Sequence, residues 1–199
     1  MKKLIAVALI AGFSAPAFAG SMQQPIAEPQ VMAPPPSAPA QVNWTGAYAG
    51  ATLGFGRASW DTATGGGRTT SGGAALHAGY NMDMGTWVAG GELSVAPGFN
   101  QTVGSREISW GANARLRAGP KFGEEGRLWG FGTVGDSHVR HDAVGGGDAR
   151  STNGWVAGVG VSHLMQNNLI LTGEVLHGRS RGTAGVNGTG VALGASFRF

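Results

Sequence analysis

Apolar and polar residues alternate along most of the chain from Asn43 to the C-terminus. In the last segment, Val191 to Phe199, the odd positions are apolar and the even positions are small or polar. A period of two is typical of a β-strand with one apolar face. Seven further segments share the pattern, and each has about the length of a strand that crosses a membrane at a tilt. The eight predicted strands are 47–57, 73–82, 87–95, 108–118, 128–136, 154–163, 169–177 and 191–199.

One of these segments, 128–136, leaves its orientation open. Trp129 and Phe131 alternate with Leu128 and Val134, and either pair could form the apolar face. In the other segments the polar residues share one face, so we expect that face to point into the interior of a barrel.

The connections between the predicted strands alternate in length. Short turns at one end and long loops at the other are typical of outer-membrane barrels. We therefore predict an all-β fold, an eight-stranded antiparallel up-and-down transmembrane β-barrel whose last strand pairs with the first. Both chain ends would lie on the short-turn, periplasmic side. The short connections are 81–86, 119–127 and 164–168, and the long ones are 60–72, 96–106, 137–153 and 178–189.

The N-terminal region has the features of an exported protein. Lys2 and Lys3 precede an apolar run that is too short to span a bilayer as a helix, and Ala17-Phe18-Ala19 provides a cleavage site. The segment that follows has six prolines and few bulky side chains, which predicts a disordered leader in the periplasm. The expected organisation is a signal peptide at 1–19, a Pro-rich leader at 20–42 and the barrel at 43–199.

The composition agrees with a sheet and argues against nucleic-acid binding. Glycine accounts for 37 of 199 residues, but it alternates with large apolar residues rather than forming low-complexity runs. The chain has no cysteine, so stability must come from a hydrogen-bonded sheet. The formal net charge of +3 falls to +1 without Lys2 and Lys3, which provides no electrostatic basis for binding nucleic acid.

Charged residues recur on the predicted inward faces. The interior of an eight-stranded barrel is only wide enough to be filled by side chains, and charges buried there must pair. Such an interior has no accessible cleft for a paired-carboxylate hydrolase and predicts little or no ionic current. The predicted lumen salt-bridge core consists of Glu92, Arg115, Arg117, Glu174 and Arg198.

Two motifs resemble cofactor or catalytic sites but lack the required context. Gly130 to Gly135 matches a dinucleotide fingerprint, yet no helix pattern follows it. Ser162, His163 and Glu174 resemble a lipid-hydrolase triad, but adjacent strand residues point to opposite faces. We therefore predict a protein that is not an enzyme, with no catalytic residues, cofactor or metal site.

The long connections carry polar residues with binding potential. His138, His141 and Asp142 could hold a metal or haem iron, although a solvated loop is the simpler interpretation. Six tryptophans lie mostly near strand ends, as expected of interfacial aromatic girdles. Arginines in or beside the long loops could bind lipopolysaccharide phosphates, for which the guanidinium fork is suited. They are Arg68, Arg106, Arg140, Arg150, Arg179 and Arg181.

Four short motifs follow one another in the order typical of one family. Asn43-Trp-Thr-Gly-Ala-Tyr-Ala-Gly50 opens the barrel, Gly79-Tyr80-Asn81 closes the second strand, Gly90-Gly-Glu92 lies in the third, and Phe197-Arg-Phe199 ends the chain. Over residues 43–199 the chain resembles the small outer-membrane β-barrel surface antigens of Gram-negative bacteria. These are the opacity-protein-like group often labelled porin-family or OmpA-like barrel proteins.

The resemblance implies a role in envelope integrity and in surface interaction or adhesion through extracellular loops. The expected partners are outer-membrane lipid, lipopolysaccharide, and peptidoglycan or a host surface. The alternative is a narrow porin-like channel or a haem-binding surface protein. The resemblance also implies that Phe199 is the assembly signal read by the barrel-assembly machinery.

Overall fold

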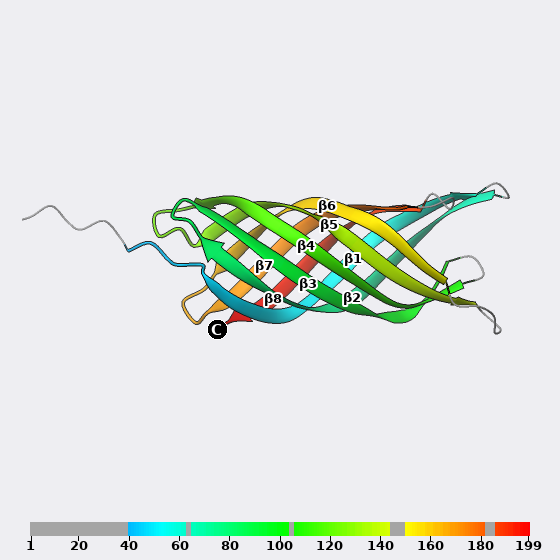
Figure 1. Ribbon diagram of the computed structural model, residues 1–199, viewed down its shortest axis with the longest axis horizontal. Helices are drawn as coiled ribbons and strands as arrows, with labels where there is room; N and C mark the ends of the chain where they lie inside the picture. Colours follow the sequence, from blue (N-terminus) through cyan, green and yellow to red (C-terminus); the bar gives the residue numbers. More distant parts are fainter. Residues whose placement is uncertain (1–39, 63–64, 104–105, 144–149, 182–185) are drawn as a thin grey trace, which may run out of the picture. The chain divides into compact units, whose positions relative to one another are not determined.

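The computed structural model describes residues 40–62, 65–103, 106–143, 150–181 and 186–199. Eight antiparallel strands form a closed barrel in which each strand pairs with its neighbours in sequence (Figure 1). Within the described residues, no helix is long and apolar enough to cross a membrane. The strands are β1 (Gly46–Thr62), β2 (Gly65–Asp83), β3 (Trp87–Val103), β4 (Arg106–Phe122), β5 (Leu128–Ala143), β6 (Arg150–Leu164), β7 (Leu169–Ser180) and β8 (Asn187–Arg198).

The last strand closes the barrel against the first, as the sequence predicts. The β1–β8 ladder runs from Tyr48 opposite Arg198 to Ser59 opposite Asn187. Beyond it, the Phe199 amide donates a hydrogen bond to the Ala47 carbonyl oxygen at 2.9 Å. Pairing these two strands removes the free edges that an open sheet would present. The predicted eight-stranded antiparallel barrel is confirmed.

The barrel carries most of its large apolar side chains on the outside. Leu116 is 68% exposed and Leu193 is 69% exposed, whereas Glu92 of β3 and Arg115 and Arg117 of β4 are buried inside. On β1 the outward apolar face runs from Ala47 to Phe55. At about 3.4 Å per residue and a tilt of about 40°, this stretch covers roughly 20 Å of membrane. That is close to the ~25 Å apolar band of outer-membrane barrels.

The structure settles the orientation of β5. Trp129 and Phe131 point inward and are almost completely buried, while Leu128 and Val134 point outward. Inside the barrel, the Phe131 ring lies under the Arg117 guanidinium, with 4.5 Å between the guanidinium carbon and the ring centroid. The local pattern could not reveal this because both faces of β5 carry large apolar residues, and only the partner across the lumen distinguishes them.

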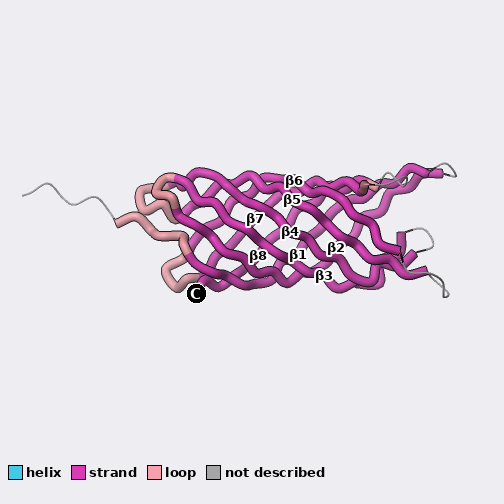
Figure 2. Tube along the Cα trace, in the orientation of Figure 1, coloured by secondary structure: helices cyan, strands magenta, loops and turns pink. Residues whose placement is uncertain are grey.

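The strands are longer than predicted, and the long loops are correspondingly shorter. The strands have 12 to 19 residues, and the β1–β2 ladder continues to Thr62 opposite Gly65. Most of the segments predicted as long loops therefore extend the strands at the end away from the chain ends (Figure 2). Alternation of apolar residues marks only the part of a strand that faces lipid, whereas backbone pairing continues through Gly, Ser and Thr.

The wall of the barrel has a seam between β2 and β3. Their ladder starts at Asp83 opposite Val88 and stops at Leu76 opposite Val95, although both strands continue. The β1–β2 hairpin therefore separates from β3 at this end, while β1 stays paired with β8 (Figure 1). Pro97 follows the last pair on β3, and a proline has no amide hydrogen to donate to a ladder.

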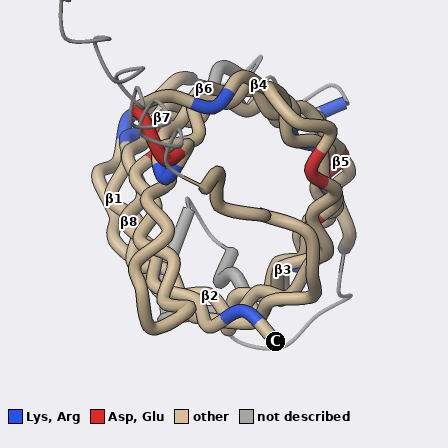
Figure 3. Tube along the Cα trace, turned by 90° about the vertical axis from the view of Figure 1, so that its left-hand side faces the viewer, with Lys and Arg blue, Asp and Glu red and all other residues tan. Residues whose placement is uncertain are grey.

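At the opposite end, the segment before β1 covers the mouth of the barrel, which Figure 3 views end on. Trp44 is fully buried, and its indole nitrogen donates to the Gly126 carbonyl oxygen at 2.9 Å. The Val42 amide donates to the Glu125 carbonyl oxygen at 2.8 Å. The predicted signal peptide and residues 20–39 of the predicted leader lie outside the described residues. The end of the leader, in contrast, is hydrogen-bonded to the barrel.

The tryptophans do not form the predicted girdle as a group. Trp87 and Trp110 point outward and are half exposed, as interfacial residues should be. Trp44 and Trp129 instead pack edge to face inside the barrel, with ring centroids 5.6 Å apart. The side chain of Trp60 lies outside the described residues. A side chain faces the lipid or the lumen according to whether its position in the strand is odd or even. Closeness to a strand end therefore does not predict which of the two it faces.

Candidate functional site

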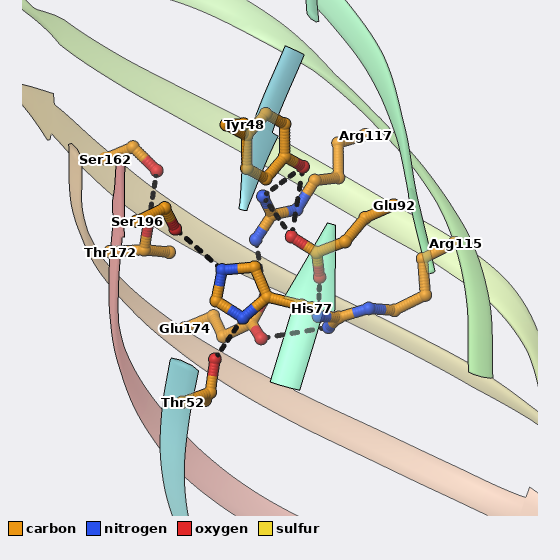
Figure 4. A network of polar contacts seen from close by, with 10 residues as sticks. All are labelled: Tyr48, Thr52, His77, Glu92, Arg115, Arg117, Ser162, Thr172, Glu174 and Ser196. Carbon is orange, nitrogen blue, oxygen red and sulfur yellow. Dashed lines mark hydrogen bonds and ion pairs between the residues drawn. The ribbon is translucent and has the colours of Figure 1, made fainter. Parts of the chain in front are cut away.

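The centre of the lumen contains an ionic cluster of four charged side chains. Glu92 of β3 lies directly opposite Arg115 of β4, and Arg117 follows two positions later on the same inward face. Glu174 of β7 reaches the same point from the other side of the barrel (Figure 4). All four side chains are buried. The structure thus brings together four of the five residues predicted for the lumen salt-bridge core.

Each carboxylate of the ionic cluster contacts both guanidinium groups. Arg115 Nη1 lies 2.9 Å from Glu174 Oε1, and its Nη2 pairs with Glu92 Oε1. Arg117 Nη1 lies 2.9 Å from Glu92 Oε2, and its Nη2 lies 3.5 Å from Glu174 Oε2. The two negative and two positive charges cancel. Because an unpaired buried charge costs several kcal/mol, this balance is what makes the polar interior stable.

Neighbouring side chains fix the ionic cluster in place. The Tyr48 hydroxyl donates to Glu92 Oε2 at 3.0 Å and accepts from Arg117 Nη1 at 3.3 Å. Phe131 packs against one face of the Arg117 guanidinium in a cation–π contact. Aromatic residues therefore hold the guanidinium plane and one carboxylate oxygen in a single orientation.

A second polar layer adjoins the ionic cluster. His77 Nδ1 lies 2.9 Å from Thr52 Oγ1, and His77 Nε2 lies 2.6 Å from Ser196 Oγ. Ser162 Oγ and Thr172 Oγ1 form a further hydrogen bond of 2.8 Å (Figure 4). Both ring nitrogens of His77 are thus hydrogen-bonded. Through these bonds the layer connects β2 to β1 and β8.

Arg198 does not belong to the ionic cluster, so this part of the sequence prediction is wrong. Its Nη2 donates to Asn168 Oδ1 at 2.9 Å, and its Nη1 donates to the Asn43 carbonyl oxygen. These acceptors lie at the rim near the chain ends. A guanidinium at the end of a strand can bind exposed acceptors without the desolvation cost of entering the lumen.

The residues of the hydrolase-like and dinucleotide-like motifs are not brought together in the barrel. Ser162 is 1% exposed inside the barrel, whereas His163 is exposed on the outside. The dinucleotide-like segment Gly130–Gly135 lies within β5. His138 Nδ1 lies 2.6 Å from Asn153 Oδ1, and the side chain of His141 lies outside the described residues. Among the side chains that the structure describes, no group of three or more His, Asp or Glu could hold a metal ion.

Five of the six predicted lipopolysaccharide-binding arginines lie on strands rather than in loops. Arg68, Arg140 and Arg179 are exposed on β2, β5 and β7. Arg181 follows β7, and its Nη2 lies 2.7 Å from Asp136 Oδ1. Arg106 and Arg150 begin β4 and β6, and their side chains lie outside the described residues.

Three outward arginines lie in two adjacent polar rows that cross β7, β8, β1 and β2. The ladders place these rows directly beyond the last apolar row, which consists of Val175, Val191, Phe55 and Gly72. Hydrogen bonds within the rows join His177 to Thr189 at 2.8 Å and Ser59 to Asn187 at 2.7 Å. The first polar row is His177, Thr189, Arg57 and Thr70, and the second is Arg179, Asn187, Ser59 and Arg68.

The three arginines of these two polar rows are Arg57, Arg68 and Arg179, and we refer to them together as the arginine rows. The sequence prediction missed Arg57 because it lies at the end of a predicted transmembrane strand. The signal was nevertheless present, since Arg57 has the same parity as Phe55 and ends the outward apolar series of β1.

Comparisons with known proteins agree with this architecture. A family model described as an outer membrane protein β-barrel domain matches residues 5–199. Neisserial surface protein A (NspA) aligns with a TM-score of 0.53 and 14% identity, over 78% of this chain and 98% of that chain. Ail, the attachment invasion locus protein of Yersinia pestis, aligns with a TM-score of 0.46 and 19% identity, over 78% and 99%. No curated protein matches the chain.

At 14% identity, the likeness to NspA concerns the fold alone. The family model covers nearly the whole chain, and the outward apolar band is the feature that such a barrel needs in its membrane. The chain therefore belongs to the outer membrane protein β-barrel domain family.

Proposed function

We propose that the protein is a barrel without enzymatic or channel activity that supports envelope integrity by binding lipopolysaccharide phosphates through the arginine rows. The observation that carries this proposal is the position of Arg57, Arg68 and Arg179 in the two polar rows directly beyond the apolar band. The phosphates of a glycolipid lie at that level when its acyl chains lie against the barrel. Arginine binds phosphate through two parallel hydrogen bonds.

The proposal places the arginine rows outside the cell and both chain ends in the periplasm. The support for this orientation is the asymmetry of the strands, which extend well beyond the apolar band only at the end away from the chain ends. Outer-membrane barrels have short periplasmic turns and larger extracellular extensions. The extended strand ends would then be available for surface contacts or adhesion, and the Pro-rich leader would face the peptidoglycan.

The closed lumen supports a role that does not involve conduction. The ionic cluster fills the middle of the barrel, and Trp44 and Trp129 pack together inside it nearer the chain ends. An ion crossing this interior would have to displace buried charge pairs, which is costly. In planar bilayers we expect no single-channel steps, and regular conductance steps would favour the alternative of a narrow channel.

The arginine rows can be tested with the triple variant Arg57→Gln, Arg68→Gln and Arg179→Gln. A charge-assisted hydrogen bond at an exposed site contributes on the order of 1 kcal/mol, so losing three should weaken binding to phosphorylated lipopolysaccharide by about 100-fold. The measurement is the affinity of the folded protein in nanodiscs for phosphorylated and dephosphorylated lipopolysaccharide. The control is Arg127→Gln, which changes a partly exposed arginine at the opposite rim.

We expect the control to bind as the parent does, and dephosphorylated lipopolysaccharide to bind the parent and the triple variant equally. If the triple variant retains the affinity of the parent for phosphorylated lipopolysaccharide, the arginine rows are not the binding site. If Arg127→Gln loses as much affinity, the effect is one of total charge rather than of a site.

A further inference from the structure

The half of the lumen away from the chain ends contains a cavity of about 390 Å³. Small residues of β1, β4 and β8 form much of its wall, among them Gly54, Gly111 and Ala192. Leu176 and Val139 are its largest inward side chains. The other half is filled by Trp44, Trp129 and Phe131, so the barrel is packed at one end and hollow at the other.

The floor of this cavity is closed and carries no net charge. Thr52 forms part of the floor, and its hydroxyl is hydrogen-bonded to His77 and so is not available to a ligand. His77 is in turn bonded to Ser196, and the balanced ionic cluster adjoins this layer. The floor therefore offers neither a free charge to attract an ion nor a path through the barrel.

The cavity borders the seam between β2 and β3. Its wall includes Gly72, Gly73 and Ala74 of β2 and Ala96 and Pro97 of β3, all of them beyond the last β2–β3 pair. Gly72 lies in the last apolar row of the outer surface, at the level of the membrane. The backbone ladder between β2 and β3 is therefore missing at a depth where the surroundings are hydrocarbon.

We propose that this cavity binds the alkyl chain of a membrane lipid, which enters sideways through the seam between β2 and β3. A water molecule needs two to four polar partners, and the wall, which is mostly glycine, alanine and aliphatic residues, offers few side-chain partners. An apolar occupant needs none. With a volume of about 30 Å³ per water-sized unit, the cavity has room for an alkyl segment of about a dozen carbons.

The test uses the full barrel in nanodiscs, with ¹³C-labelled methyl groups on leucine. Leu176 points into the lumen, so a nuclear Overhauser effect from its methyl groups to lipid chain protons requires a chain inside the barrel. Leu193, which is 69% exposed to lipid, is the positive control. A second arm uses perdeuterated lipid with protonated dodecanoate and so distinguishes a lipid chain from a free fatty acid.

Two variants fill the cavity, and one matched variant does not. A Cβ at Gly54 would lie 3.8 Å from its nearest neighbour and one at Gly111 would lie 3.7 Å away, so the Cβ of Gly54→Leu or Gly111→Leu meets no clash and the rest of the side chain extends into the cavity. Gly132→Leu adds the same side chain on the outer face, where a Cβ meets nothing within 4 Å. We expect each filling variant to reduce the Leu176 effect at least fivefold, and Gly132→Leu to leave it unchanged.

A Leu176 signal from the lipid chains of the parent that the filling variants remove supports the proposal, whereas a signal from dodecanoate alone would show that the cavity takes a free fatty acid and would overturn it. Cross-peaks from Leu176 to water alone would overturn the proposal. So would a signal that persists in both filling variants. If a filling variant loses its heat-modifiable migration and is unfolded, the parent measurement and the other variant decide the question.

Discussion

Replacing Glu92 by glutamine should unbalance the interior of the barrel. The change keeps the shape of the side chain but leaves Arg115 and Arg117 facing the single carboxylate of Glu174. Glu92 also accepts the hydrogen bond from Tyr48 at 3.0 Å, which the amide can retain only by turning its nitrogen toward a guanidinium. A buried charge that loses its partner typically costs 3–5 kcal/mol. We therefore expect Glu92→Gln to lower the free energy of unfolding by about 4 kcal/mol.

The assay is reversible urea unfolding from phospholipid vesicles, followed by tryptophan fluorescence. Glu125→Gln is the matched control because it makes the same chemical change in an exposed carboxylate that pairs with Arg127. An exposed ion pair contributes at most about 1 kcal/mol, so the control should be nearly neutral. The two variants differ in burial rather than in chemistry, which isolates the effect of the lumen.

A second substitution tests whether charge balance is the cause. Arg115→Met alone should cost about as much as Glu92→Gln, because it leaves a carboxylate in excess. Combining the two restores neutrality and leaves the pair between Arg117 and Glu174, so the double variant should recover at least about 2 kcal/mol relative to additivity. Additive losses, or a loss below about 1 kcal/mol for Glu92→Gln, would show that the ionic cluster is solvated and does not stabilise the barrel.

Three further changes should separate packing, backbone fit and assembly. Trp44→Ala removes a fully buried ring from the mouth of the barrel and should cost about 3–5 kcal/mol in the same urea assay. Gly119→Ala would place a Cβ in contact with the Gly130 carbonyl oxygen and should abolish folding into vesicles, whereas Gly132→Ala should fold as the parent does. Phe199→Ala should slow assembly in cells, measured as the heat-modifiable fraction, with little change in urea stability because the ring is 77% exposed.

The sequence predicts those features of the fold that depend on alternation. Each strand that faces lipid has a simple outward series, such as Leu53 and Phe55 on β1, and parity alone then places Glu92, Arg115, Arg117 and Glu174 inside. Their convergence follows because the lumen is narrow and the charges must pair. Four of the five predicted cluster residues could therefore be found without coordinates.

Other features depend on what lies across the lumen or beyond the membrane. The inward ring of Trp129 is determined by Trp44, which is far away in sequence, and Arg198 has the inward parity but reaches acceptors at the rim. The ladders beyond the apolar band leave no periodic signal, because their outward residues face water. The seam at Leu76 and Val95 was also hidden, since it is the absence of pairing between two segments that each look like strands.

The ionic cluster also helps to determine the register of the sheet, which the apolar band cannot do. Shifting one strand by two residues leaves every side chain on its original face, so lipid contacts do not distinguish the native register from this alternative. Such a shift between β3 and β4 would move Glu92 from opposite Arg115 to opposite Asn113 or Arg117 and would break the fourfold pairing with Glu174. The loss of buried ion pairs makes the shifted register less stable by several kcal/mol. In this barrel the polar interior therefore provides the specificity that a close-packed apolar core provides in a soluble protein.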